Sequence, residues 1–254
     1  MPAVFIGHGS PMNAVEHNRF TTAWAEFGSS IPKPRAVLAV SAHWYIGHTA
    51  VTAMEQPRTI HDFYGFPPNL YAIEYAAPGS PQVAEEVVRQ LDPTWVGLDR
   101  DSWGIDHGTW SVLVHMFPDA DIPVLQLSID ATKPMSEHLE IGRRLDGLRD
   151  SGVLVLGSGN VVHNLRMLDW SAPDSAFDWN DEFDALVRGI MQDAPERIIE
   201  VESDRNFPPA VPTPDHFLPL VYVAGIAAES GNPARVLVGG PQFGSLSMTS
   251  FVVD

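Results

Sequence analysis

The stretch AVLAVSAHWY, residues 36–45, begins with five apolar residues and reaches a histidine, His43, shortly after them. Two further apolar runs, AVFI at residues 3–6 and VLVL at residues 153–156, are similarly short and also contain valine. Runs of this length are too short for helices, and continuous apolar runs are typical of strands buried on both faces of a parallel sheet. The three runs therefore predict the centre of a parallel β-sheet.

Helical patterns alternate with these strands. Apolar residues at helical spacing predict helices at residues 19–27, 81–91, 134–148 and 179–191. Further strands are expected at residues 123–129, 235–238 and 247–253, and the last of these could be an antiparallel edge. The alternation predicts an α/β fold, a layered α/β/α sandwich with a mostly parallel, mixed central sheet.

The length of the chain, 254 residues, suits one large α/β domain, and no internal repeat or low-complexity tract divides it. Its proline-rich stretches also contain apolar and aromatic residues, which is typical of ordered loops and not of linkers. We expect a single domain, residues 1–254. The sequence does not indicate an oligomeric state.

The charge of the chain limits its partners. It has 32 Asp and Glu against 15 Lys and Arg, a formal net charge of −17, so a nucleic-acid partner is not expected. The N-terminus lacks the features of a signal peptide, and the longest apolar stretch, around residues 218–228, is too short for a membrane span. We therefore expect no membrane partner and a soluble, cytoplasmic protein.

Cysteine is absent, which excludes disulfides, thiolate nucleophiles, iron–sulfur clusters and cysteine-ligated zinc. Any metal must be held by nitrogen and oxygen ligands. The sequence also lacks the G-x-S-x-G, H-E-x-x-H, P-loop and G-x-G-x-x-G motifs. It therefore has no signature of a serine hydrolase, a zincin, a P-loop enzyme or a simple dinucleotide-binding protein.

Four histidines occupy positions that suit metal ligands. His8, His43 and His163 each follow one of the three apolar runs, and loops at the carboxyl ends of such strands meet at one edge of the sheet. His216 is expected to join them from a helix start in PTPDHFLPL, with Thr213 as N-cap and Pro214 in the first helical position. Because neutral imidazole is a common ligand of zinc, iron, copper and nickel, the joint pattern predicts one shared metal centre.

Each of these histidines alone is equally compatible with a structural, hydrogen-bonded role, and only the joint pattern favours a metal. The remaining histidines of the chain that lie on polar helices, in a turn or on an apolar helix face are interpreted as surface or packing residues. These are His17, His48, His115 and His138.

Two further segments contain candidate site residues. His107 lies in WGIDHGTW, residues 103–110, where glycines allow a close backbone approach to a ligand; the alternative is a helix start with Asp106 as N-cap. His61 and Asp62 lie in an aromatic, proline-stiffened loop that suggests the lid of a substrate pocket. A plain surface loop is the alternative for that pair.

The motifs GHGSPMN, SAHWY, IHDFYGFP, APGSP, WGIDHGTW, QLSID, SGNVVHNLR, PTPDHFLPL and GSLSM follow one another along nearly the whole chain. In this order and spacing the chain resembles the DODA-type extradiol aromatic ring-opening dioxygenases of the LigB-like superfamily, and most closely the bacterial DOPA-cleaving members. The resemblance implies a LigB-like fold and a non-haem metal enzyme. Such an enzyme inserts both atoms of O₂ into a catechol and cleaves the ring beside the two hydroxyls, which gives a ring-opened semialdehyde.

The resemblance also implies roles for individual residues. His8, His43 and His216 fall on metal-ligand positions, His163 is either a further ligand or an acid/base, and His107 is the second catalytic histidine. Many extradiol enzymes use two histidines and one carboxylate, whereas this chain has His216 at the third position, as in the DODA branch. One divalent metal per chain is expected, with Zn²⁺ in the isolated protein and Fe²⁺ for turnover, because redox-inert zinc cannot pass electron density to O₂.

Two alternatives from other classes remain at this point. A zinc-dependent hydrolase would use the same histidines to activate water, and a non-catalytic metal-binding interaction protein could keep the same fold. The hydrolase is disfavoured because no glutamate stands beside a candidate ligand as a general base. The interaction protein is disfavoured because all five histidines of the predicted site are present.

Overall fold

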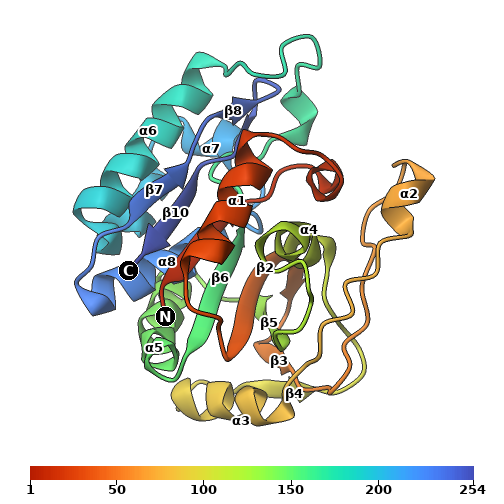
Figure 1. Cartoon of the computed structure of the whole chain (residues 1–254). Helices are drawn as coiled ribbons and strands as arrows, with labels where there is room; N and C mark the ends of the chain where they lie inside the picture. The colour runs from red at the N-terminus through yellow and green to blue at the C-terminus, as the bar shows by residue number, and fades with distance from the viewer.

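An eight-stranded sheet forms the middle of the computed structural model, which describes residues 1–254 (Figure 1). Its strands are β1 (Ala3–Gly7), β2 (Ala36–Ile46), β3 (Ala50–Thr52), β4 (Gly97–Asp99), β5 (Val124–Asp130), β6 (Val153–Gly159), β7 (Arg235–Val238) and β10 (Ser250–Val253). They lie in the order β4-β3-β5-β2-β6-β1-β10-β7. The strands β8 (Pro241–Gln242) and β9 (Leu246–Ser247) form a separate two-stranded sheet.

The three apolar runs of the sequence form three neighbouring central strands, β2, β6 and β1, which are parallel to one another. Alternate residues of β2 face opposite cores: Leu38 and Val40 belong to one apolar cluster, and Val37 and Ala39 belong to the other. Both faces of the strand are therefore buried, which is why its sequence is continuously apolar. The prediction of a mostly parallel, mixed sheet is confirmed.

The closing run of the chain forms an antiparallel strand, but this strand is not at the edge. β10 pairs antiparallel with β1 on one side and with β7 on the other, so β7 is the edge strand. At the opposite edge, β3 pairs antiparallel with β5 and parallel with β4. Strands β3 and β4 have three residues each, which is too short to leave a pattern in the sequence.

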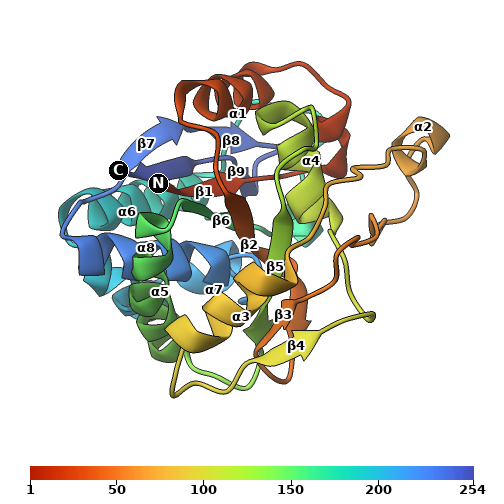
Figure 2. The same ribbon diagram turned by 60° about the horizontal axis from the view of Figure 1, so that its bottom comes forward.

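Helices cover both faces of the sheet (Figure 2). The helices α1 (Arg19–Ser30) and α4 (His107–Met116) pack on one face, and α3 (Pro81–Gln90), α5 (Met135–Asp150), α6 (Asp178–Asp193) and α8 (Leu218–Ser230) contribute to the core of the other. The short elements are η1 (Pro11–Ala14), α2 (Pro68–Tyr71), η2 (Leu165–Met167), η3 (Pro195–Ser203) and α7 (Phe207–Ala210). All four helices expected from periodicity are present. No helix combines the length and the apolar composition that crossing a bilayer requires.

The helix near His216 begins later than expected. Thr213 and Pro214 do not cap or open it; instead the carbonyl of Pro214 accepts hydrogen bonds from the backbone N–H groups of Phe217 and Leu218, and α8 begins at Leu218. A helix that started at Pro214 would place Pro219 in its interior, where proline has no N–H to donate and clashes with the preceding turn. His216 therefore lies in a turn before α8.

Two glycines allow α5 and α8 to touch through their backbones. A Cβ on Gly142 would lie 2.2 Å from the carbonyl oxygen of Tyr222, and a Cβ on Gly225 would lie 2.2 Å from that of Leu139. Any side chain at either position must push the helices apart.

We expect Gly225→Ala to lower the free energy of unfolding by about 1–3 kcal/mol, the usual effect of overpacking a core. The matched control is Gly189→Ala in α6, where a Cβ would meet nothing within 4 Å. That control should be stabilising by about 0.5–1 kcal/mol, since alanine is the better helix former. Urea denaturation measures both, and equal effects of the two substitutions would contradict the close helix contact.

Candidate metal centre

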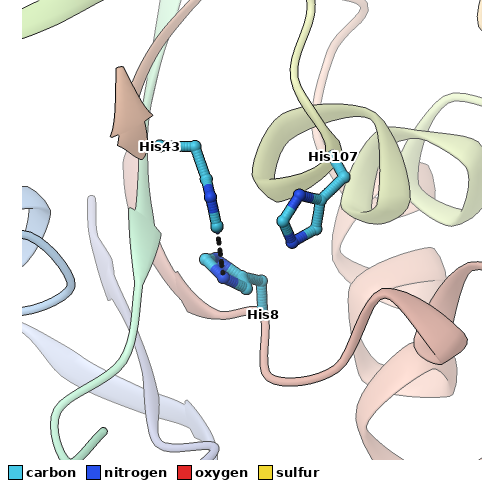
Figure 3. Close-up of side chains that lie close together, drawn as sticks. All are labelled: His8, His43 and His107. Atoms are coloured by element: carbon cyan, nitrogen blue, oxygen red, sulfur yellow. Dashed lines mark hydrogen bonds between the residues drawn. The ribbon is translucent and has the colours of Figure 1, made fainter. Parts of the chain in front are cut away.

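Five histidines come together at the carboxyl ends of the central strands. His8 follows β1, His43 lies within β2, His107 is the first residue of α4, His163 follows β6, and His216 lies in the turn before α8. Ring-centroid distances are 3.9 Å for His43–His107, 3.5 Å for His163–His216, 5.2 Å for His8–His43 and 5.4 Å for His8–His216. Figure 3 shows His8, His43 and His107 directed toward one another. The structure thus brings together every histidine that the sequence analysis assigned to the metal or to catalysis.

Three of these rings form a group that could hold an ion. His8, His43 and His107 each offer one nitrogen, and these nitrogens lie within 4.8 Å of one another. The Nε2 atoms of His8 and His43 are 3.3 Å apart (Figure 3). Two ligands at the usual distance of about 2.0–2.1 Å from a tetrahedral zinc ion have nitrogens about 3.3–3.4 Å apart. The observed spacing, which is also within hydrogen-bond distance, fits two ligands of one metal.

Hydrogen bonds on the far side of the rings fix their tautomers. The Nδ1 atom of His8 lies 2.9 Å from the Ser158 hydroxyl, which donates its own proton to the carbonyl of Gly108, so His8 must be the donor. The Nδ1 atom of His43 lies 3.0 Å from Oδ2 of Asp62 and likewise donates. The Nε2 atoms of the two rings therefore face each other, and a neutral ring presents a lone pair there.

The other rings extend the same pattern. His107 donates from Nδ1 to Oδ1 of Asp62 at 2.9 Å, and His216 donates from Nδ1 to Asp215. Histidine ligands of metals usually donate their second N–H to a carboxylate, carbonyl or water, which leaves the other nitrogen free. The ring of His163 is held differently, by stacking on His216 with an angle of 5° between the planes.

Burial keeps most of these rings neutral. The pKa of His8 lies well below that of a free histidine because the ring is buried and because His43 and His216 disfavour another positive charge. Burial also lowers the pKa of His163, His216 and His107. A neutral imidazole is the form that binds metals, so these rings are ready to bind one without losing a proton first.

Carboxylates surround the imidazoles. Burial lowers the pKa of His43 too, but its hydrogen bond to Asp62 and the charge of Asp106 outweigh burial, so that the net shift is upward. Burial would raise the pKa of Asp62, but hydrogen bonds from His107 and His43 hold it below the usual range. Asp62 and Asp215 form ion pairs with histidines only. An N- and O-rich site with excess negative charge fits a divalent cation such as zinc or iron.

A buried polar network supports the first turn of α4. Asp106 caps this helix, as the sequence suggested, by accepting the backbone N–H of Thr109. Its carboxylate also accepts hydrogen bonds from the Ser41 hydroxyl and from the side-chain amide of Gln126, whose oxygen accepts the backbone N–H of Asp106. Ser41, Gln126 and Ser158 were not predicted from the sequence. Their signal is a polar residue within an apolar strand, because burial of such a group requires a hydrogen-bond partner.

The glycine beside His107 allows α4 to approach the rings. A Cβ on Gly108 would lie 2.8 Å from Cδ2 of His43 and 3.3 Å from Cε1 of His8. The predicted close backbone approach therefore exists, and it is made to the histidine rings. His107 is both the first residue of α4 and part of the histidine cluster, so the two interpretations of this residue hold together.

The two candidates in the 59–67 loop occupy different places. Asp62 reaches the cluster, whereas His61 points elsewhere: its Nε2 donates to the carbonyl of Ile73 at 2.9 Å, and its ring packs against Trp110 and Phe63. Among the other histidines, His17 and His48 are exposed, His115 bonds to the carbonyl of Asn13, and His138 is buried against Tyr222. None of these four takes part in the cluster.

Comparison with known proteins identifies the family of the chain. A family model described as the catalytic LigB subunit of aromatic ring-opening dioxygenase matches residues 2–244. The chain belongs to the LigB family. It is 47% identical over 256 residues to 4,5-DOPA dioxygenase extradiol of Escherichia coli (strain K12), covering 98% of this chain and 93% of that protein. It is 36% identical to 4,5-DOPA dioxygenase extradiol of Beta vulgaris, covering 89% and 87%.

A solved structure supports the LigB fold of this chain. The crystal structure of an uncharacterized protein from Escherichia coli K12 matches with a TM-score of 0.88 at 42% identity and covers 100% of both chains. The LigB-family chain is therefore a metal-dependent extradiol dioxygenase with an α/β/α fold. No observation favours the hydrolase or the interaction protein.

The stability of the metal-free protein should depend on pH through His8. This ring stays neutral in the folded protein, whereas in the unfolded chain it titrates near about 6.5. As the pH falls below that value, the unfolded state binds a proton that the folded state cannot, and stability is lost at up to about 1.4 kcal/mol per pH unit. His8→Asn should flatten this decline, while substitution of the exposed His17 by Asn should not. Denaturant titrations from neutral to mildly acidic pH give the slopes; equal slopes in His8→Asn and wild type would count against a buried neutral His8.

Proposed function

We propose that this LigB-family enzyme opens the ring of a catechol of the DOPA type with O₂, using one Fe²⁺ ion held by His8, His43 and His216. The observation that carries the proposal is the 3.3 Å separation of the Nε2 atoms of His8 and His43, whose Nδ1 atoms are both hydrogen-bonded on the side away from this contact. The substrate class is suggested by the relatives, which are named as 4,5-DOPA dioxygenases. We propose zinc for the protein as isolated and iron for turnover.

Two histidines compete for the third ligand position. His216 has its ring centroid 5.1 Å from that of His43, and Asp215 fixes its tautomer. His107 has a nitrogen within the 4.8 Å group. The choice of His216 is supported by its place in the PTPDH motif, which resembles the ligand position of DODA-type enzymes. His163, stacked on His216, lies within reach as a fourth ligand.

The metal would supply chelation of the two adjacent catechol oxygens and, as Fe²⁺, electron density for O₂. The remaining work falls to side chains of the chain. His107 has its Nδ1–H tied to Asp62, so its Nε2 is the free base that could accept a proton from a catechol hydroxyl. His163 and His107 are neutral before substrate binds because burial lowers the pKa of each. Either ring could hold the proton taken from the catechol and return it when the ring-opened product forms.

An aromatic wall beside His107 would shield these proton transfers from water. Phe63 lies edge-on to His107, with ring centroids 5.4 Å apart at 89°, and Phe66 in turn lies edge-on to Phe63. Such rings also offer a flat substrate a surface for packing. We propose that the whole chain, residues 1–254, acts as one domain, since the histidines of the site span residues 8 to 216 and meet at one edge of the same sheet.

Single substitutions should identify the ligands. We expect His43→Ala and His216→Ala to lose most of their metal, and His107→Ala to keep it while turnover falls by a factor of roughly 10²–10⁴, as for loss of a positioned proton-transfer group. Elemental analysis of the purified variants measures the metal, and His61→Ala, outside the cluster, is the control. Full metal content in His43→Ala would exclude the shared centre. Loss in His107→Ala with retention in His216→Ala would make His107 the third ligand.

The reaction itself can be tested by isotope labelling. Protein loaded with Fe²⁺ under anaerobic conditions should consume O₂ with a catechol and form a yellow semialdehyde, whereas the zinc form should be inactive or nearly so. With ¹⁸O₂, both added oxygen atoms should appear in the product by mass spectrometry. Product without label would refute dioxygenation and favour metal-assisted hydrolysis.

A further inference from the structure

Asp62 lies between the rings of His43 and His107. In the proposed function, His43 is a metal ligand and His107 is a proton-transfer group. Oδ2 of Asp62 lies 3.0 Å from Nδ1 of His43, and Oδ1 lies 2.9 Å from Nδ1 of His107. The same Oδ1 accepts the backbone N–H of His107 at 2.9 Å. One carboxylate thus receives three hydrogen bonds from two residues on different elements, His43 of β2 and His107 of α4.

The backbone around Asp62 is fixed to the segment that carries His107. The N–H of Ile60 donates to the carbonyl of Ile105, and the N–H of Ile105 donates to the carbonyl of Arg58, both at 2.8 Å. The indole N–H of Trp110 donates to the carbonyl of Ile60 at 2.8 Å. The carboxylate is therefore delivered to the two rings by a paired backbone and not by a free loop.

We infer that Asp62 is a positioning residue that sets the tautomers of His43 and His107 together, so that both rings, in their neutral form, present an unprotonated Nε2 to the centre. An ionised carboxylate only accepts hydrogen bonds, and each ring can therefore meet it only with an Nδ1–H. The rings lie 3.9 Å apart between centroids, and a single shared acceptor orients them as a unit. The inference rests on the proposed function for the roles of the two Nε2 atoms, metal binding by His43 and proton transfer by His107. The tautomers themselves do not depend on that function.

Asparagine at position 62 would break this arrangement without changing its shape. An amide has one oxygen that accepts and one NH₂ group that only donates. The oxygen should remain at the Oδ1 site, where two N–H groups of His107 point, so that the NH₂ group faces Nδ1 of His43. His43 would then have to accept at Nδ1 and carry its proton on Nε2, where the metal would be bound.

The first experiment is a comparison of metal affinity in Asp62→Asn and wild type, with Zn²⁺ titrated against a chromophoric chelator. We expect Asp62→Asn to bind Zn²⁺ about 10–100-fold more weakly, the usual effect of removing the outer partner of a ligand. The matched control is Asp99→Asn, because Asp99 also accepts several hydrogen bonds, from Ser102 and from the backbone N–H groups of Asp101 and Trp103, but does so outside the cluster. Asp99→Asn should bind Zn²⁺ as wild type does.

The second experiment reads the tautomers directly and needs no metal or activity. In metal-free wild type labelled with ¹⁵N-histidine, NMR should show His43 and His107 both protonated at Nδ1. In Asp62→Asn, His43 should switch to Nε2–H while His107 keeps its tautomer. A merely structural Asp62 would leave both rings unchanged in the isosteric variant.

The outcomes separate this inference from the proposed function. Unchanged tautomers or unchanged Zn²⁺ affinity in Asp62→Asn would overturn the positioning role, even if the protein is an active catechol dioxygenase. If the tautomers are as expected but the Fe²⁺-loaded protein consumes no O₂ with any catechol, the positioning role of Asp62 stands and the proposed function is wrong. If Asp62→Asn does not fold, the wild-type spectrum still decides, because an Nε2–H tautomer at either ring would overturn the inference.

Discussion

The hydrogen bonds at Nδ1 of the central histidines are the constraint on which the site depends. Ser158, Asp62 and Asp215 each accept a hydrogen bond from the Nδ1–H of a ring on the side away from the centre, and the opposite nitrogens then have to face inward. These acceptors are themselves fixed, Ser158 by its place in β6 and by the carbonyl of Gly108. Metal affinity in such a site comes from rings that are already oriented and neutral before the ion arrives.

The sheet makes this orientation possible because its central strands are parallel. β1, β2 and β6 end at the same edge, and the turn that carries His216 is bonded there, since the N–H of Asn160 donates to the carbonyl of His216. Gly159 is required for this contact, because a Cβ on it would lie 2.1 Å from that carbonyl oxygen. Backbone contacts at this distance leave little freedom for the rings to drift apart.

The sequence predicted what depends on hydrophobic pattern and on strand ends. The parallel centre of the sheet and the convergence of His8, His43 and His163 follow from apolar runs and the residues after them. His216 was predicted from an expected helix start, and His107 was assigned to the site by the resemblance. The sequence did not predict that Asp62 meets both His43 and His107, because that contact depends on a long loop whose path no periodicity describes. Gln126 and Ser158 were missed for a related reason: each is a single polar residue in a strand, and its partner is known only once the strands are paired.

The position of β10 has a consequence for how the protein is made. β10, residues 250–253, lies between β1 and β7. The edge of β1 that faces β10 therefore has no partner until β10 has been synthesised. His8 follows that same strand, at the opposite end of the chain from β10. The sheet around the centre is therefore completed only after synthesis of the last strand, and during synthesis the N-terminal strand must be kept from pairing elsewhere.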